Sequence, residues 1–150
     1  MRARSILCIG LLLAAAGLAS PVAAAGKLKV EQAWVRTPPP GAVALAGYAV
    51  LRNSGDAPVI IHGAHSPDFA AVSIHETTEA DGVERMQALD TVEVAPGARV
   101  VFAPGGKHLM LMRPSRSLSS GAAVKIHFDT NDSDGVDASF IVGDGAPSGH

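Results

Sequence analysis

Most of the chain predicts an all-β fold. Apolar and polar residues alternate with a period of two in a series of short segments, as they do in strands that bury one face. Clusters of glycine, proline, asparagine and aspartate separate nearly all of these segments, and such residues tolerate or impose turn geometry. About nine short strands in one domain predict a sandwich or a Greek-key barrel.

The expected strands follow one another in short steps along the chain. They span residues 29–35, 43–52, 58–64, 71–76, 83–89, 99–103, 108–113, 123–130 and 136–142. Turn signals lie at residues 53–56, 80–82, 95–97, 104–106 and 132–135. The alanine-rich segment 43–50 has some helix propensity, but Gly41, Gly47 and the run over 48–51 favour a strand.

Residues 1–25 have the pattern of a secretory signal peptide. Arg2 and Arg4 make a short basic region before the apolar residues 6–19. Three alanines at 23–25 suit signal peptidase. The apolar run of about fourteen residues is shorter than the roughly twenty that a membrane-spanning helix needs. We therefore expect cleavage after the alanines and a periplasmic protein without a membrane anchor, with a retained anchor as the alternative.

Residues 26–150 are expected to form a single domain, in which 143–150 is a flexible tail. A chain of this length can bury one apolar core without disulfides. The only cysteine, Cys8, lies within the predicted signal, so the mature chain has no thiol. Without Arg2 and Arg4, ten basic residues face fourteen acidic ones, which gives a net charge of −4 with neutral histidines. This balance argues against a nucleic-acid partner.

Two histidines and two methionines form the most informative motif of the chain. Ten residues separate His75 from Met86, twenty-one separate Met86 from His108, and one separates His108 from Met110. Neutral thioether sulfur is a soft donor that suits Cu(I) and competes poorly for zinc or hard cations, while copper also accepts imidazole. Apart from the initiator, the only other methionine is Met112, two residues beyond the motif. We therefore predict a site for one Cu(I) per chain.

The predicted strands allow these four side chains to converge. His75 and Met86 lie at equal distances from the centre of the expected turn between them, which places them nearly opposite each other in an antiparallel hairpin. His108 and Met110 are alternate residues of one strand and so point to the same face. The glycine-rich segment 104–107 precedes this strand and is expected to place the site at an end of the barrel, where copper could pass to a partner.

The chain resembles the periplasmic copper chaperone family known as PCuAC. The signature of that family is a histidine, ten residues, a methionine, twenty-one residues and His-x-Met, which the four motif residues match without a gap. Further similar segments are residues 33–36 with 38–41, the strand 48–53 with Gly55, 75–77 before 81–83, and 104–112. The resemblance covers essentially the whole predicted mature chain.

This resemblance implies a cupredoxin-like β fold with one Cu(I) near the surface, bound by His75, Met86, His108 and Met110. It also implies a carrier that delivers copper toward cytochrome oxidase assembly, to a CuA-type centre directly or through a thioredoxin-like assembly protein. Many members have a longer C-terminal tail with additional histidine and methionine that can hold Cu(II). Here residues 143–149 lead to a single His150, which argues against a second, tail-based copper site.

Residues around the motif have structural interpretations that we favour over functional ones. Met112 is expected to pack, with a reserve sulfur donor as the alternative. Trp34 and Tyr48 are expected to anchor the core, although Trp34 could instead shield the site. The remaining histidines are expected to be solvated, turn-stabilising or surface residues; they are His62, His65 and His127.

Acidic residues around the expected hairpin also have two interpretations. They are Glu76, Glu79, Asp81 and Glu84. Acidic clusters near turns are usually solvated, and this is the interpretation that we favour. Alternatively, they form a negative rim that attracts a basic partner.

The sequence lacks the parts that common enzyme classes need. The predicted mature chain has no cysteine nucleophile, no Gly-x-Ser-x-Gly elbow and no phosphate-binding loop. Residues 129–134 resemble a calcium loop only weakly, because the full pattern with a terminal glutamate is absent. A blue-copper electron carrier would need a cysteine ligand. We therefore predict no catalysis; a general periplasmic copper-binding or copper-tolerance protein and a metal-free structural β-sandwich are the alternatives.

Overall fold

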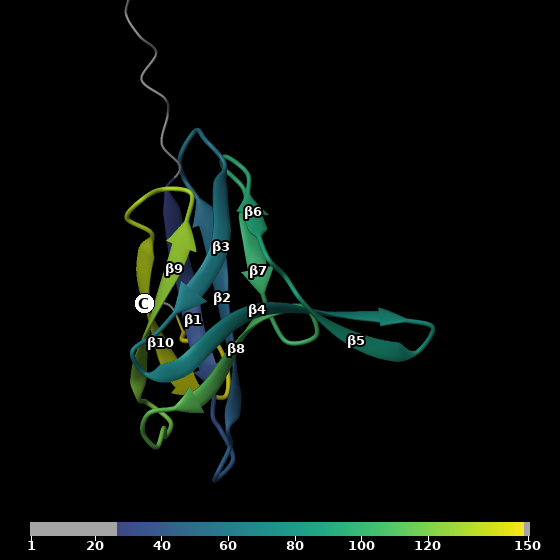
Figure 1. Cartoon of the computed structure of the whole chain (residues 1–150), viewed down its shortest axis with the longest axis vertical. Coiled ribbons are helices and arrows are strands. Elements are labelled where there is room, and N and C mark those ends of the chain that lie inside the picture. The colour runs from purple at the N-terminus through teal and green to yellow at the C-terminus, as the bar shows by residue number, and fades with distance from the viewer. Residues whose placement is uncertain (1–26, 149–150) are drawn as a thin grey trace, which may run out of the picture.

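The computed structural model describes residues 27–148, and its regular elements are ten strands (Figure 1). They are β1 (Leu28–Arg36), β2 (Ala44–Asn53), β3 (Val59–His65), β4 (Phe69–Ala80), β5 (Val83–Ala88), β6 (Val92–Val94), β7 (Arg99–Phe102), β8 (Lys107–Pro114), β9 (Ala123–Thr130) and β10 (Val136–Gly143). These described residues include no helix that could cross a membrane. The predicted signal peptide and His150 lie outside them.

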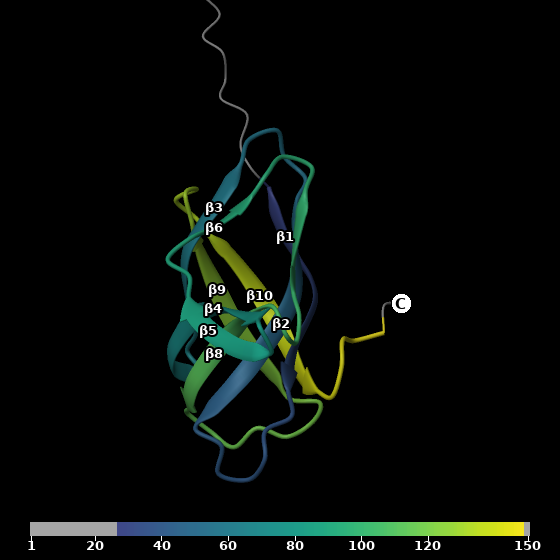
Figure 2. The same ribbon diagram turned by 90° about the vertical axis from the view of Figure 1, so that its right-hand side faces the viewer.

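The strands form one sheet in the order β5-β4-β8-β7-β2-β1-β10-β9-β3-β6. Most neighbours are antiparallel, whereas β1 pairs with β10, and β7 with β8, in parallel. The sheet curls, so that β3 contacts β4 although the two strands are not hydrogen-bonded neighbours. Figures 1 and 2 show the strands wrapped around a common interior. The predicted all-β Greek-key sandwich is confirmed, with ten strands in place of about nine.

Alternation along the strands places one apolar face inside this sandwich. In β9, Val124, Ile126 and Phe128 are buried, whereas His127 between them lies on the outer face. Phe128 packs near Phe140 of β10, with ring centroids 6.3 Å apart. Other strands contribute further fully buried side chains, including Leu51, Ile61, Leu109 and Leu111. This core holds in place the strands that carry the predicted ligands.

Two elements differ from the sequence prediction. The strand β6 is absent from that prediction because its three residues are too few to reveal an alternation. The strand β4 continues past its expected end at residue 76, because its second half pairs with β5 in a hairpin instead of covering the core. All six side chains of β5 are exposed, so burial imposes no apolar pattern on this part of the chain.

Candidate metal centre

Three neighbouring strands at one edge of the sheet carry the four predicted ligands. His75 lies in β4, Met86 in β5, and both His108 and Met110 lie in β8. His75 pairs directly with His108, and their ring centroids are 5.9 Å apart. Met110 is two residues beyond His108 and therefore lies on the same face of β8. Because β4 is hydrogen-bonded to both β5 and β8, His75 lies between the two strands that carry Met86 and Met110.

Met86 shares this face, but it is not directly opposite His75, and that prediction was wrong. The β4–β5 turn is formed by Asp81 and Gly82, with φ angles of 55° and 73°, as in a two-residue type I′ turn. This turn pairs Met86 with Thr77, two residues beyond His75. The prediction had placed the centre of the turn one residue too early. Met86 is therefore a diagonal neighbour of His75, at a separation of about 7–8 Å that a long, flexible side chain can bridge.

Small residues surround Met110 on this face. It pairs with Ser73 of β4 on one side and with Ala46 of β2 on the other. Met112, one step further along β8, pairs with alanines on both sides. The leucines that alternate with these methionines point into the core. The methionine side chains thus lie outside the main core and are not needed to fill it.

The two nitrogen atoms of His108 have distinct roles. Nδ1 lies 3.0 Å from the carbonyl oxygen of Gly106, which also accepts a hydrogen bond from the backbone N–H of Thr77 at 3.1 Å. Because a carbonyl can only accept, Nδ1 carries the proton, and Nε2 of the neutral ring keeps its lone pair. The glycine turn before β8 therefore orients His108 with Nε2 available to a metal.

His75 has a ring nitrogen with no hydrogen-bond partner among residues 27–148. Its Nε2 lies 2.9 Å from Oγ of Ser73, whereas its Nδ1 is buried and unpaired. A buried unpaired nitrogen costs free energy, which a bound metal would offset. Burial, and secondarily the neighbouring His108, lowers the pKa of His75 below its ordinary value of 6.5. The ring is thus neutral at neutral pH, as metal binding requires.

The four predicted ligands differ strongly in their exposure to solvent. His108 is only 7% exposed, whereas Met86 is 55% exposed on the edge strand β5. Figure 1 shows the β4–β5 hairpin extending away from the body of the molecule. An ion held between the imidazoles would therefore remain reachable from the hairpin side.

The four acidic residues around the hairpin have different surroundings, because only Glu76 forms an ion pair with another described residue. Nζ of Lys107 lies 2.6 Å from Oε1 of Glu76, so this carboxylate is neutralised beside the histidines. Glu79 pairs with Glu84 across the hairpin, and Asp81 occupies the turn. These three residues are exposed. Within the described residues, these three carboxylates form no ion pair, unlike that of Glu76.

An aromatic pair borders the site on the β2 side. Trp34 of β1 pairs with Tyr48 of β2, and their ring centroids are 4.8 Å apart. Tyr48 lies on the same face of β2 as Ala46, the partner of Met110. Both aromatic residues are buried as predicted, but the residues on either side of Trp34 belong to the main core. The pair therefore packs on the outer face of the sheet, beside the candidate site.

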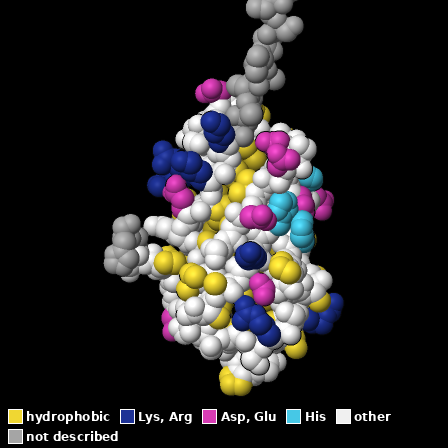
Figure 3. Space-filling model, turned by 90° about the vertical axis from the view of Figure 1, so that its left-hand side faces the viewer, with side chains coloured by type: hydrophobic (Ala, Val, Ile, Leu, Met, Phe, Trp, Pro, Cys, Tyr) yellow, Lys and Arg dark blue, Asp and Glu magenta, His cyan; other side chains and the backbone are white. Residues whose placement is uncertain are grey.

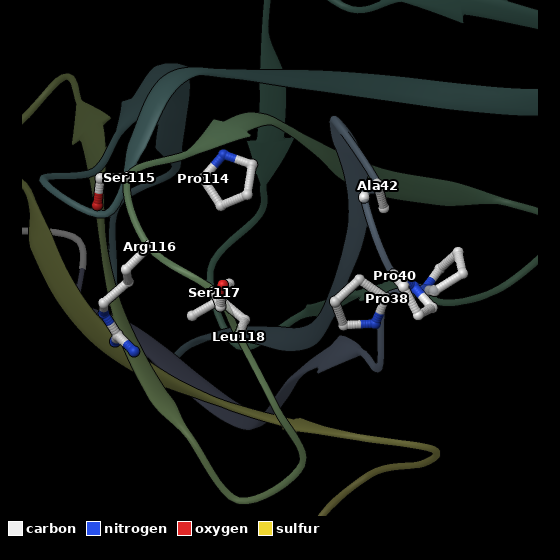
Figure 4. Close-up of a pocket in the computed structure, with 10 residues that line it drawn as sticks. Pro38, Pro40, Ala42, Pro114, Ser115, Arg116, Ser117 and Leu118 are labelled. Carbon is white, nitrogen blue, oxygen red and sulfur yellow. The ribbon is translucent and has the colours of Figure 1, made fainter.

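A cavity of about 620 Å³ lies away from these residues, next to the segment that follows β8 (Figure 4). Residues 38–42 and 114–118 line it, and Arg116 is its only charged residue. The guanidinium of Arg116 donates a hydrogen bond to the carbonyl of Ala123 and lies 3.4 Å from Oδ1 of Asp68. This cavity lacks metal-binding side chains, so we assign it no part in the candidate site.

Two histidines that were expected to be separate surface or turn residues, His65 and His127, lie side by side. His65 of β3 pairs with His127 of β9, and their ring centroids are 4.7 Å apart. Nδ1 of His65 lies 3.3 Å from a carboxylate oxygen of Asp129. The His-x-Asp spacing in β9 indicated that His127 and Asp129 share a face. Nothing in the pattern indicated that β3 pairs with β9.

Residues 28–142 match the protein family described as "Putative lipoprotein LpqE-like", which is also the family of the PCuAC domains. The chain belongs to this PCuAC family. A relative described as "Putative lipoprotein Lxx21020", from Leifsonia xyli subsp. xyli, is 31% identical over 108 residues, or 71% of this chain. The match covers 64% of that relative, so the chain spans less than two thirds of its length.

Solved PCuAC structures have the same fold. The copper-bound PCuAC domain from PmoF2 is 30% identical, with a TM-score of 0.65 over 81% of this chain and 95% of that domain. Cu(I)-bound DR1885 from Deinococcus radiodurans, solved in solution, is 26% identical, with a TM-score of 0.59 over 73% of this chain and 74% of that one. These similarities confirm the PCuAC resemblance and the β-sandwich fold.

Proposed function

We propose that this PCuAC protein binds one Cu(I) through His75, Met86, His108 and Met110 and carries it without catalysing a reaction. Neutral imidazoles and thioethers form a soft donor set without a thiolate, which suits monovalent copper. Copper-bound forms of PmoF2 and DR1885, two proteins of similar fold, support the choice of metal.

The main support for a bound metal is that each of the two neighbouring imidazoles has a ring nitrogen free of a hydrogen-bond donor role within the described chain. Nδ1 of His75 is buried and unpaired within the described chain, and Nε2 of His108 is left free by the bond from Nδ1 to Gly106. Both nitrogens belong to rings on the face that also carries the methionines. A soft ion bound there would satisfy a nitrogen that otherwise has no partner.

We further propose that the protein works in the periplasm and releases Cu(I) to an acceptor with thiolate ligands. Thiolate binds copper more strongly than thioether does, so ligand exchange would drive transfer in that direction. Exposure of Met86 on the hairpin supports release from that side. The acceptor class is the CuA-type centre of cytochrome oxidase or a thioredoxin-like assembly protein. The signal-like N-terminus and the lipoprotein description of the relative support a place in the cell envelope.

Metal preference tests the binding proposal. One equivalent of Cu(I) should stay bound to the purified protein in the presence of a competing chelator, and Ag(I) should replace it as a soft surrogate. Excess Zn(II) should not displace Cu(I), because thioethers compete poorly for zinc. Displacement of Cu(I) by Zn(II) would contradict the proposed ligand set.

Methionine substitutions test the ligands directly. Met86→Leu and Met110→Leu keep apolar volume and remove the sulfur, so each should weaken Cu(I) binding by about tenfold or more, equivalent to about 1.4 kcal/mol. Unfolding in urea should change little. Competition with a chromophoric Cu(I) chelator measures the affinity.

Met112→Leu is the matched control, because it removes the same sulfur from the next position on the same strand face. Its Cu(I) affinity should stay close to that of the unmodified protein. If the Met86→Leu, Met110→Leu double variant also binds normally, the methionines are not ligands.

The delivery proposal is tested in cells. Deletion of the gene should lower cytochrome oxidase activity under copper limitation, and added copper should restore it. A His75→Ala, His108→Ala variant should fail to complement the deletion. Full complementation by that variant would instead favour a structural role, and normal oxidase activity in the deletion strain would favour general copper tolerance.

A further inference from the structure

We propose that His65, His127 and Asp129 form a second metal site, separate from the four-residue site, that binds Zn(II). The register of β3 and β9 pairs His65 with His127 and Gly63 with Asp129. His127 and Asp129 alternate with buried residues of β9, so they lie on the outer face of the sheet. Figure 3 shows histidine side chains gathered beside acidic ones on the surface of the protein.

The spacing of the donor atoms suits a tetrahedral ion. One donor atom from each of the three residues lies within 4.8 Å of the others. Oδ1 of Asp129 is 3.3 Å from Nδ1 of His65 and 3.9 Å from Nε2 of His127. Ligands at about 2.0–2.2 Å from Zn(II) are roughly 3.3–3.6 Å apart in a tetrahedron. One pair already has this spacing, and the third donor needs only a small side-chain movement.

A second carboxylate orients His127. Nδ1 of His127 lies 2.7 Å from Oδ1 of Asp137 in β10. An ionised carboxylate can only accept, so Nδ1 carries the proton and the lone pair of the neutral ring is on Nε2. Nε2 is the atom that faces Asp129. A carboxylate that holds the outer nitrogen of a metal-binding histidine is a recurrent support of zinc sites.

The contacts among the three side chains are longer than ordinary charge-assisted hydrogen bonds. Nδ1 of His65 is 3.3 and 3.4 Å from the two oxygens of Asp129, and the contact from His127 is longer still. Charge-assisted hydrogen bonds are usually about 2.7–2.9 Å long. The two imidazole rings are tilted by 38° with their centroids 4.7 Å apart, so two protonated rings would repel each other. The three donor groups therefore lie close together without short hydrogen bonds among them.

Two glycines approach these donors more closely than a larger residue could. Gly135 has a φ of 56°, and a Cβ there would clash with Nε2 and Cε1 of the His127 ring. A Cβ on Gly63 would lie 3.0 Å from Oδ2 of Asp129. A larger residue at either position would therefore press on a donor group.

The donor set selects a different metal from that of the four-residue site. Two imidazoles and one carboxylate, without sulfur, suit Zn(II) and not Cu(I). Three protein ligands leave a fourth position for water. The protein would then bind a soft ion on β4, β5 and β8 and a harder ion on β3 and β9.

Calorimetric titration of the purified protein with Zn(II) at about pH 7.5 tests this site, because the histidines must be neutral to bind. We expect the unmodified protein to bind one Zn(II) per chain. The double variant His65→Asn, His127→Asn should bind Zn(II) at least about 100-fold more weakly, and the single variant Asp137→Asn about tenfold more weakly. The double variant His75→Asn, His108→Asn, which lacks both histidines of the copper site, should still bind Zn(II). The double variant His65→Asn, His127→Asn should still bind Cu(I).

Imidazole C–H resonances give a second measurement that needs no variant. Zn(II) should shift those of His65 and His127 and leave those of His75 and His108 in place. The proposal is overturned if His65→Asn, His127→Asn binds Zn(II) as tightly as the unmodified protein. It is equally overturned if Zn(II) perturbs His75 and His108 in preference.

Discussion

At the scale of single residues, the candidate copper site depends on which ring nitrogens carry protons. The carbonyl of Gly106 sets the tautomer of His108. Burial favours the neutral form of His75 and leaves its Nδ1 without a partner in the described chain. Both effects prepare imidazole nitrogens for a metal at some cost to the stability of the metal-free protein.

His75 should make the stability of the metal-free protein depend on pH. Its pKa is lowered in the folded state, first by burial and then by His108, so below about pH 6.5 the unfolded chain binds more protons than the folded one. Its contribution is present above that pH and is lost as the pH falls through the folded-state pKa. Urea unfolding at about pH 7.5 and pH 5 should show a larger loss for the unmodified protein than for His75→Asn. Parallel losses would contradict this.

Asn53 at the end of β2 should be a strong determinant of stability. It is fully buried, and its Oδ1 accepts hydrogen bonds from the backbone N–H groups of Lys27 and Gly55. Its Nδ2 donates to the carbonyls of Ala57 and Val94. Because Asn53→Ala would leave these groups unpaired, the free energy of unfolding should fall by about 2–4 kcal/mol in urea titrations.

An exposed asparagine provides the comparison. Oδ1 of Asn131 accepts a hydrogen bond from the backbone N–H of Ile60 at 2.9 Å, but water can replace it there. Asn131→Ala should therefore cost less than about 1 kcal/mol. Equal costs for the two variants would mean that burial of Asn53 is not what makes it important.

At the scale of elements, the β4–β5 hairpin decides where Met86 lies. Its turn residues Asp81 and Gly82 both have positive φ, and their two-residue turn sets the pairing of Met86 with Thr77. Since all side chains of β5 are exposed, packing contributes little to this register. The turn thus controls the distance from Met86 to His75.

Gly82→Val should therefore weaken Cu(I) binding more than it weakens the fold. A β-branched residue is strained at a φ of 73°, so the turn should shift and carry Met86 away from the histidines. We expect up to about a tenfold loss of affinity, or about 1.4 kcal/mol. Gly97→Val is the matched control, because Gly97 has a φ of 72° and equally open surroundings but lies in the β6–β7 turn. Equal affinities of the two variants would show that the hairpin register does not matter.

At the scale of the whole molecule, one apolar core holds the strands that carry both candidate metal sites. Phe140 is fully buried in it beside Phe128, and its strand β10 joins β1 to β9. Phe140→Ala should lower the free energy of unfolding by about 3–5 kcal/mol, because it removes a large buried side chain and leaves a cavity. Val101→Ala, at a position that is 50% exposed, should cost much less in the same urea titration. Similar costs would mean that this core is not the main source of stability.

The sequence by itself determined the local features of this protein. Alternation placed Val124, Ile126 and Phe128 inside, and it put His108 and Met110 on one face, because neighbouring side chains of a strand point to opposite sides. Turn residues marked nearly every chain reversal. The spacing of histidine and methionine carried the resemblance to PCuAC, which the similarity to solved PCuAC domains confirms.

Only the tertiary structure decided which strands are neighbours and in which register. The pairing of His75 with His108 depends on β4 lying beside β8, and the pairing of His65 with His127 depends on β3 lying beside β9. The diagonal position of Met86 depends on a turn one residue later than its expected centre. Period-two alternation is a property of each strand alone, whereas pairing between distant strands follows from the packing of the whole core, which no local pattern encodes.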